Sequence, residues 1–180
     1  MTCSQSDSFY QELYFTEGII YYFHEKKFEE AEYFFSYSLE FANYAPIFTH
    51  LNTLSHICLC NLILKNINAL EINFVKVQSL YKKIISNYSE SEMLKSIDSL
   101  YIYQFLLHQL SNYQESILVG EKIFELLRKN HQSLYVEKTT YLLMCSNKKL
   151  RQDKEALNYT EIVKIFSIFN ANNSLFENFC

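Results

Sequence analysis

Glycine and proline are scarce in this sequence, and their scarcity excludes several classes of protein. The 180 residues include two glycines and one proline, where average usage would give about 22 of the two together. Glycine-rich phosphate loops, nucleophile elbows, collagen repeats and proline-rich linkers all need residues that the chain lacks. Because 49% of the residues are apolar and 17% are aromatic, a disordered chain is excluded as well.

Charge and cysteine usage argue against nucleic-acid binding, metal binding and secretion. The net charge is −4, and only Arg128 and Arg151 among the 16 basic residues are arginines, so we expect no direct contact with nucleic acid. The five cysteines are scattered, without a C-x-x-C pair, which predicts free thiols and no zinc site. No segment reads as a signal peptide or as an apolar run long enough to cross a membrane. We therefore predict a cytoplasmic protein without membrane contact.

Apolar residues recur at steps of three and four almost throughout the chain, which is the spacing of one helix face. Phe15, Ile19 and Tyr22 show this spacing near the N-terminus. Seven breaks divide the pattern into eight predicted helices of about 15 to 20 residues, joined by connections typical of antiparallel helix pairs. The fifth predicted helix runs without interruption between the breaks at 86–91 and 111–112.

The predicted helix pairs resemble one another. A small residue recurs early in the second helix of each pair, at Ala31, Ala69, Ser116 and Ala156. We expect it where two helices cross most closely, because a larger side chain would push their axes apart. Gly18 in the first helix similarly permits close approach, at a cost of about 1 kcal/mol of helix propensity. Since a helix hairpin cannot cover its own apolar face, successive hairpins should stack.

The first pair resembles a tetratricopeptide repeat (TPR). Its residues in the order characteristic of that family are Phe15, Gly18, Tyr22, Phe28, Ala31, Phe35 and Leu39. The mean period is about 42 residues rather than about 34, and such longer helices resemble the C-terminal sensor domains of PlcR-, Rgg- and Rap-type quorum-sensing regulators without their N-terminal module. The resemblance implies an all-α, right-handed superhelix of about four stacked antiparallel helix pairs. This domain would span residues 8–169, between a short N-terminal tail (1–7) and a C-terminal tail (170–180).

The resemblance also implies a non-enzymatic module that binds a peptide or a protein in a concave groove, lined by the first helix of each pair. In the first pair, we expect the groove to be lined near Leu13, Thr16, Ile20 and Phe23. The candidate binding residues are Asn61, Asp98, Tyr101, Phe105, Tyr141 and Lys148. The aromatic members would anchor the ligand and the polar members would fix its orientation. For each aromatic residue, a place in the core between repeats is the alternative interpretation.

Two functional hypotheses follow from this groove. The first is a regulatory, peptide-sensing domain related to quorum-sensing transcription regulators. The alternative is a structural scaffold that joins two partners without sensing a peptide. An apolar last helix and a tail that carries phenylalanines suggest either a folded-back cap or a homodimer contact, since terminal repeats normally need a polar outer face. The family resemblance favours the homodimer.

The residue pattern predicts neither catalysis nor a cofactor. The five histidines show no H-E-x-x-H or other metal-ligand spacing. Stacked helical repeats rarely supply a closed, dry pocket for an activated nucleophile. Cys145 has a register that would face the groove, but we interpret it as a buried, unreactive thiol.

Overall fold

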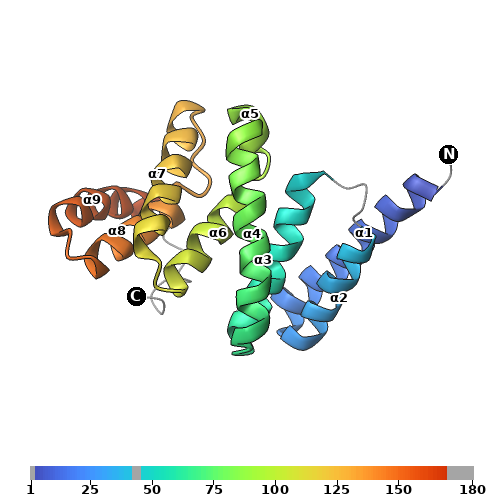
Figure 1. Cartoon of the computed structure of the whole chain (residues 1–180). Helices are drawn as coiled ribbons and strands as arrows, with labels where there is room; N and C mark the ends of the chain where they lie inside the picture. Colours follow the sequence, from blue (N-terminus) through green and yellow to red (C-terminus); the bar gives the residue numbers. More distant parts are fainter. Residues whose placement is uncertain (1–2, 42–45, 170–180) are drawn as a thin grey trace. The chain divides into compact units, whose positions relative to one another are not determined.

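The computed structural model describes residues 3–41 and 46–169, and every element within these ranges is a helix (Figure 1). The prediction of an all-α protein is thereby confirmed. The chain divides into two compact units, residues 1–99 and 100–180. The first unit contains α1 (Cys3–Ile20), the π-helix η1 (Tyr21–Glu25), α2 (Phe28–Glu40), α3 (Ile47–Ile63), α4 (Ile67–Asn87), α5 (Glu90–Leu94) and the start of α6 (Ile97–Gln109). The second contains the rest of α6, α7 (Tyr113–Lys129), α8 (Val136–Lys149) and α9 (Asp153–Phe169).

The prediction of an uninterrupted fifth helix is wrong, because α5 and α6 are separate helices. At the turn between them, the N–H groups of Lys95 and Ser96 donate to the carbonyls of Glu92 and Met93, each three residues back. Such a turn tightens the backbone by less than one residue per turn. It leaves the spacing of apolar residues nearly unchanged, so periodicity does not reveal it. Within the described ranges, no helix combines the length and the apolar character needed to span a membrane.

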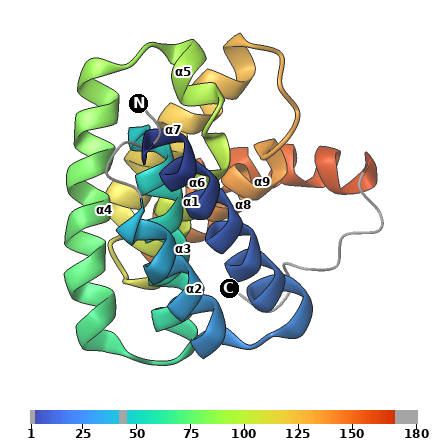
Figure 2. The same ribbon diagram turned by 90° about the vertical axis from the view of Figure 1, so that its right-hand side faces the viewer.

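Helices α1 and α2 pack side by side (Figure 2), and Gly18 makes this close approach possible. A Cβ atom at Gly18 would lie 2.6 Å from ring carbons of Phe35, which is fully buried. The predicted role of Gly18 is therefore confirmed. The hydroxyl of Ser38 on α2 also donates to the backbone carbonyl of Gln11 on α1, at 2.9 Å. Packing and hydrogen bonding together fix the register of these two helices.

The fourth residue of α2, α4, α7 and α9 is buried in each case. Ala31, Ser116 and Ala156 occupy this position as predicted, and each is at most 2% exposed. In α4 the position belongs to Leu70, which is fully buried, whereas Ala69 is half-buried. The prediction of Ala69 is thus wrong by one residue, because α4 begins at Ile67 and places its fourth side chain one residue later.

Five helix ends close on residues other than glycine in the left-handed backbone region. Their φ angles lie between 53° and 61°, and they are Lys26, Lys65, Ser111, His131 and Arg151. At four of these ends the next N–H bonds to a carbonyl five residues earlier, as Asn66 does to Asn61 at 2.9 Å. After Lys26, which ends the π-helix, the N–H of Lys27 bonds to the Tyr21 carbonyl six residues earlier. This closure satisfies carbonyls at the helix end and usually takes glycine. The shortage of glycine therefore has a structural cost, since a Cβ in this region costs about 1–2 kcal/mol.

A chain of buried hydrogen bonds joins α6, α7 and α8 in the second unit. The hydroxyl of Ser116 donates to the Gln104 carbonyl at 3.1 Å, and that of Ser146 donates to Ser116 at 3.3 Å. Nδ1 of His108 lies 2.8 Å from the Ser146 oxygen. Because the Ser146 hydroxyl hydrogen is donated to Ser116, the His108 nitrogen is the donor in this bond. Gly120 on α7 lies against this chain, where an added Cβ would collide with the side-chain amide of Gln104.

Candidate functional site

A polar pocket of about 240 Å³ opens in the first unit where α1, α3 and the turn between α5 and α6 meet. The residues of its wall are Gln11, Glu12, Phe15, Phe48, Thr49, Asn52, Lys95, Ser96, Asp98 and Ser99. Ligand pockets typically combine apolar walls with a few polar groups that fix orientation. This pocket has both, so we take it as the candidate functional site.

Two side-chain amides of the wall lack hydrogen-bond partners within the described part of the chain. Gln11 is 3% exposed, and its Nε2 donates to nothing. Oδ1 of Asn52 is also buried and accepts from nothing. An unpartnered buried polar atom costs about 1–3 kcal/mol, and native proteins satisfy nearly all such atoms. A bound molecule or solvent would supply the partners that this donor and this acceptor lack within the described chain.

The backbone beneath both amides is held by side-chain hydrogen bonds. The hydroxyl of Ser38 on α2 donates to the backbone carbonyl of Gln11, and Nδ1 of His56 lies 2.9 Å from the backbone carbonyl of Asn52. The His56 ring packs between Phe15 and Phe35, with ring centroids 5.5 and 5.1 Å away. Burial among these rings lowers the pKa of His56, which keeps the imidazole neutral at pH 7. These contacts hold the backbone of Gln11 and Asn52 in place.

The charged groups of the pocket are two carboxylates and one ammonium. Glu12 and Asp98 form no ion pair within the described residues. The charge of Asp98 is felt by His56, whose pKa it raises against the larger effect of burial. Lys95 lies close enough to Glu92 to lower the pKa of that carboxyl, in addition to the larger effect of hydrogen bonds from Ser89. The pocket is therefore net negative.

An exposed, mainly apolar stripe runs along α1 and into η1 beside the pocket. Its members are Phe9, Leu13, Thr16, Ile20 and Phe23, all exposed. The first four are spaced by four, three and four residues, which places them on one side of the helix. At 100° per residue, Glu12 lies between this stripe and Gln11, so the stripe and the pocket adjoin. Four of the five members are the residues that the sequence predicts at the groove.

Asn61 and Asp98 are the predicted binding residues that lie in the first unit. Asp98 lines the pocket. Asn61 is 1% exposed, and its Nδ2 donates to the Ile57 carbonyl at 2.9 Å, one turn back along α3. In this conformation the Asn61 amide therefore serves its own helix.

The other four predicted binding residues lie in the second unit and do not line the polar pocket. The Tyr101 ring packs 5.4 Å from that of Tyr135, and burial, followed by the charge of Tyr135, raises the pKa of its hydroxyl. Phe105 and Tyr141 are half-buried, and Lys148 is exposed near the end of α8.

The pattern of residues along the chain does not single out Gln11 or Asn52. A weak signal for both was present. Gln11 lies four residues before Phe15 and seven before Gly18, and Asn52 lies four before His56, so both share a helix face with buried residues. A polar side chain on a core-facing position is the pattern that could have identified them. The pattern alone does not distinguish a satisfied core amide from an unsatisfied one.

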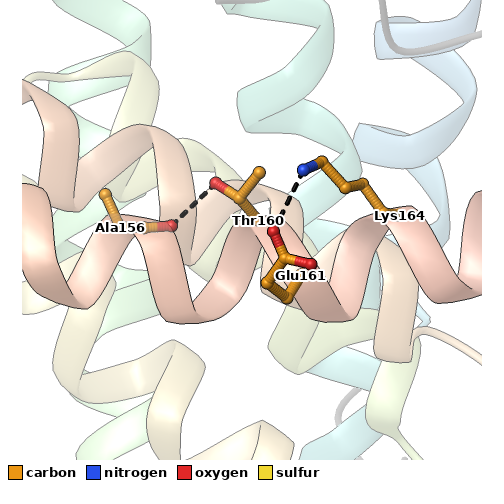
Figure 3. Close-up of polar contacts among 4 residues, drawn as sticks. All are labelled: Ala156, Thr160, Glu161 and Lys164. Carbon is orange, nitrogen blue, oxygen red and sulfur yellow. Dashed lines mark hydrogen bonds and ion pairs between the residues drawn. The ribbon is translucent and has the colours of Figure 1, made fainter.

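A second, apolar groove of about 490 Å³ lies in the second unit, lined by α7, the connection between α7 and α8, the first residue of α8, and α9. The polar contacts of α9 in Figure 3 stay within that helix. Thr160 donates to the Ala156 carbonyl at 2.9 Å, and Lys164 pairs with Glu161 at 3.0 Å. Such local contacts stabilise the helix by a few tenths of a kcal/mol, and they do not build a polar site.

The buried nucleophiles and imidazoles do not form a catalytic group. No described cluster of three or more His, Cys, Asp or Glu could hold a metal ion. His108 and Ser146 are hydrogen-bonded, but Nδ1 of His108 is the donor in that bond rather than a base, and Ser146 is fully buried. Cys58 and Cys60 are free thiols whose pKa burial raises to about 12. The prediction of free thiols is wrong for Cys145, which is disulfide-bonded, since sequence alone does not reveal pairing.

Comparison with known proteins gives no family to which this chain can be assigned: no protein-family model and no curated protein matches its sequence. The TPR resemblance stays a prediction. The function proposed next therefore rests on the pocket of the first unit and on the residues around it.

Proposed function

We propose that this protein is a non-enzymatic peptide-binding module that holds an extended peptide by its backbone in the polar pocket. The unpartnered Nε2 of Gln11 and Oδ1 of Asn52 carry this proposal. The first needs an acceptor and the second needs a donor. A peptide group supplies both, because each residue other than proline has one C=O and one N–H. Phe15 and Phe48 add apolar contact to the same wall.

A TPR-like stacking of helix pairs and a regulatory role belong to the same proposal. The side-by-side packing of consecutive helices, the close approach at Gly18 and the small buried residues such as Ala31 support a repeat architecture. Stacked helical hairpins present extended surfaces that suit peptide and protein ligands. A peptide that supplies the missing hydrogen bonds would stabilise the bound conformation, which is the property that a peptide sensor needs.

The proposal is tested by selecting peptides from a phage-displayed random decapeptide library on the immobilised full-length protein, followed by calorimetry with the synthetic peptides. Gln11→Met keeps the volume of the side chain and removes the unpartnered donor. We expect it to weaken peptide binding roughly tenfold or more. We also expect an unchanged or higher free energy of unfolding, because an unsatisfied buried group is gone. A purely structural glutamine would give the opposite pattern.

The matched control is Gln114→Ala, which removes an exposed amide from α7 in the other unit. It should bind the selected peptides as the wild type does. Equal affinity of Gln11→Met, Asn52→Ala and the wild type for every selected peptide would refute the pocket assignment. If no peptide is selected and a folded protein partner is found instead, the scaffold alternative replaces the sensor.

A further inference from the structure

We infer that the peptide bound in this pocket is basic and apolar, with a lysine or arginine side chain against Glu12 and Asp98 and apolar side chains along the stripe of α1. This inference rests on the proposed function and adds the chemistry of the ligand. Its observations are the charge of the pocket, the exposed stripe and the unpartnered atoms of the wall.

The charges around the pocket favour a cation. Glu12 and Asp98 form no ion pair in the described chain, whereas the one ammonium, Lys95, already lies near Glu92. The same bias extends over the N-terminal part of the sequence. Residues 1–46 contain eight Asp or Glu and two Lys, which gives a net charge of −6. A field of one sign over a concave site attracts a ligand of the opposite sign.

The unpartnered atoms of the wall agree with this charge. The backbone N–H assigned above to Oδ1 of Asn52 leaves that oxygen a second lone pair for an ammonium or guanidinium group, which is a donor without acceptor capacity. Nε2 of Gln11 needs an acceptor, which the backbone carbonyl of the same peptide residue supplies. A carboxylate ligand could satisfy only Gln11, and it would meet two carboxylates. The wall therefore discriminates between basic and acidic side chains.

The stripe of α1 accounts for the apolar part of the ligand. Phe9, Leu13 and Ile20 are 62%, 40% and 38% exposed, although removing such apolar side chains from water is favourable. From Phe9 to Ile20 the stripe is about 16 Å long at 1.5 Å per residue. An extended peptide of about five residues has that length. Glu12 and Glu17 flank the stripe on either side at 100° per residue, so they can pair with basic residues beside the apolar ones.

The test uses two acetylated and amidated decapeptides with the same leucines and phenylalanines, one carrying two arginines and the other two glutamates in their place. Fluorescence anisotropy measures their binding to the full-length protein at low and high salt. We expect the arginine peptide to bind roughly tenfold or more tightly. We expect this preference to shrink as salt screens the charges.

Variants of exposed residues then locate the contact. Glu12→Gln should weaken binding of the arginine peptide several-fold, whereas Glu29→Gln on α2 removes an exposed carboxylate outside the pocket and should not. Leu13→Asn should weaken both peptides, and Ile72→Asn on α4, which is 62% exposed, is its control. Because these side chains are exposed, the variants should fold as the wild type does.

Each outcome decides between the inference and the function on which it rests. Selected peptides that need Gln11 but bind without preference for basic residues, or equally well to Glu12→Gln, would overturn the inference and leave peptide binding intact. Failure of every peptide, including library-selected ones, would overturn both. Preference for the arginine peptide that is lost in Glu12→Gln and kept in Glu29→Gln supports both.

Discussion

Lys65 ends the α3 helix in the left-handed backbone region, and this position predicts a stabilising substitution. Its φ is 58°, its side chain is exposed, and its N–H donates to the Leu62 carbonyl at 3.2 Å. A Cβ in this region costs about 1–2 kcal/mol, and glycine avoids that cost. Glycine also raises the conformational entropy of the unfolded chain, which lowers the free energy of unfolding by about 0.4–1 kcal/mol relative to alanine. The difference predicts that Lys65→Gly stabilises the protein by about 0.5–1 kcal/mol.

The matched control for this prediction is Lys65→Ala, which removes the same side chain but keeps the Cβ. Urea unfolding followed by circular dichroism gives the free energy of unfolding of both variants and of the wild type. We expect Lys65→Ala to lie near the wild type, so that the difference between Gly and Ala measures the backbone effect alone. A glycine variant no more stable than the alanine variant would show that the left-handed region carries no strain here.

Three further predictions concern the interior. Gly120→Ala should destabilise the protein by about 1–3 kcal/mol, less the gain in helix propensity, because the added methyl group displaces a buried amide. Urea unfolding measures this loss of stability, and a stabilised variant would contradict the tight contact. The pKa values of His56 and His108 are both lowered, mainly by burial, so the unfolded chain binds protons more readily than the folded one. The free energy of unfolding should therefore fall as the pH drops from 6.5 toward 5, by at most about 1.4 kcal/mol per pH unit for each ring. Replacing His108 by glutamine should flatten that slope in unfolding measurements at several pH values, and an unchanged slope would argue against its contribution. The thiols of Cys58 and Cys60 have pKa values near 12, so they should not react with a thiol reagent at pH 8 until urea unfolds the chain. Prompt reaction of the native protein would show that these thiols are accessible.

The helices themselves follow from local features of the sequence. Ser89 and Glu92 have the sequence spacing of a capping box, and the Ser89 N–H donates to the Glu92 carboxylate at 2.9 Å. Gly18 was recognisable because glycine inside a helix costs stability and therefore needs a packing reason. The turn that separates α5 from α6 was not recognisable, since it preserves the apolar spacing on both sides.

The candidate site was predicted only in part. Asp98 lines the pocket, and the exposed side of α1 was expected at the groove. Asn61 has the residue type of a ligand-binding amide, but its hydrogen bond to Ile57 satisfies it within its own helix. Gln11 and Asn52 belong to different helices, and the absence of partners for their amide atoms depends on every neighbouring side chain. No pattern along one helix contains that information.

The sequence by itself determined the helical class of this protein and the close helix contacts at Gly18 and Ala31, although it did not reveal the turn between α5 and α6. Helical periodicity, capping residues and small residues act between neighbours in the chain, so they can be recognised without a fold. Tertiary structure alone decided which polar atoms are satisfied. The Gln104 carbonyl accepts from Ser116 on another helix, whereas Nε2 of Gln11 has no hydrogen-bond partner within the described residues. Hydrogen-bond satisfaction is a property of the atoms that packing brings within about 3 Å, and packing joins residues that are distant in the sequence.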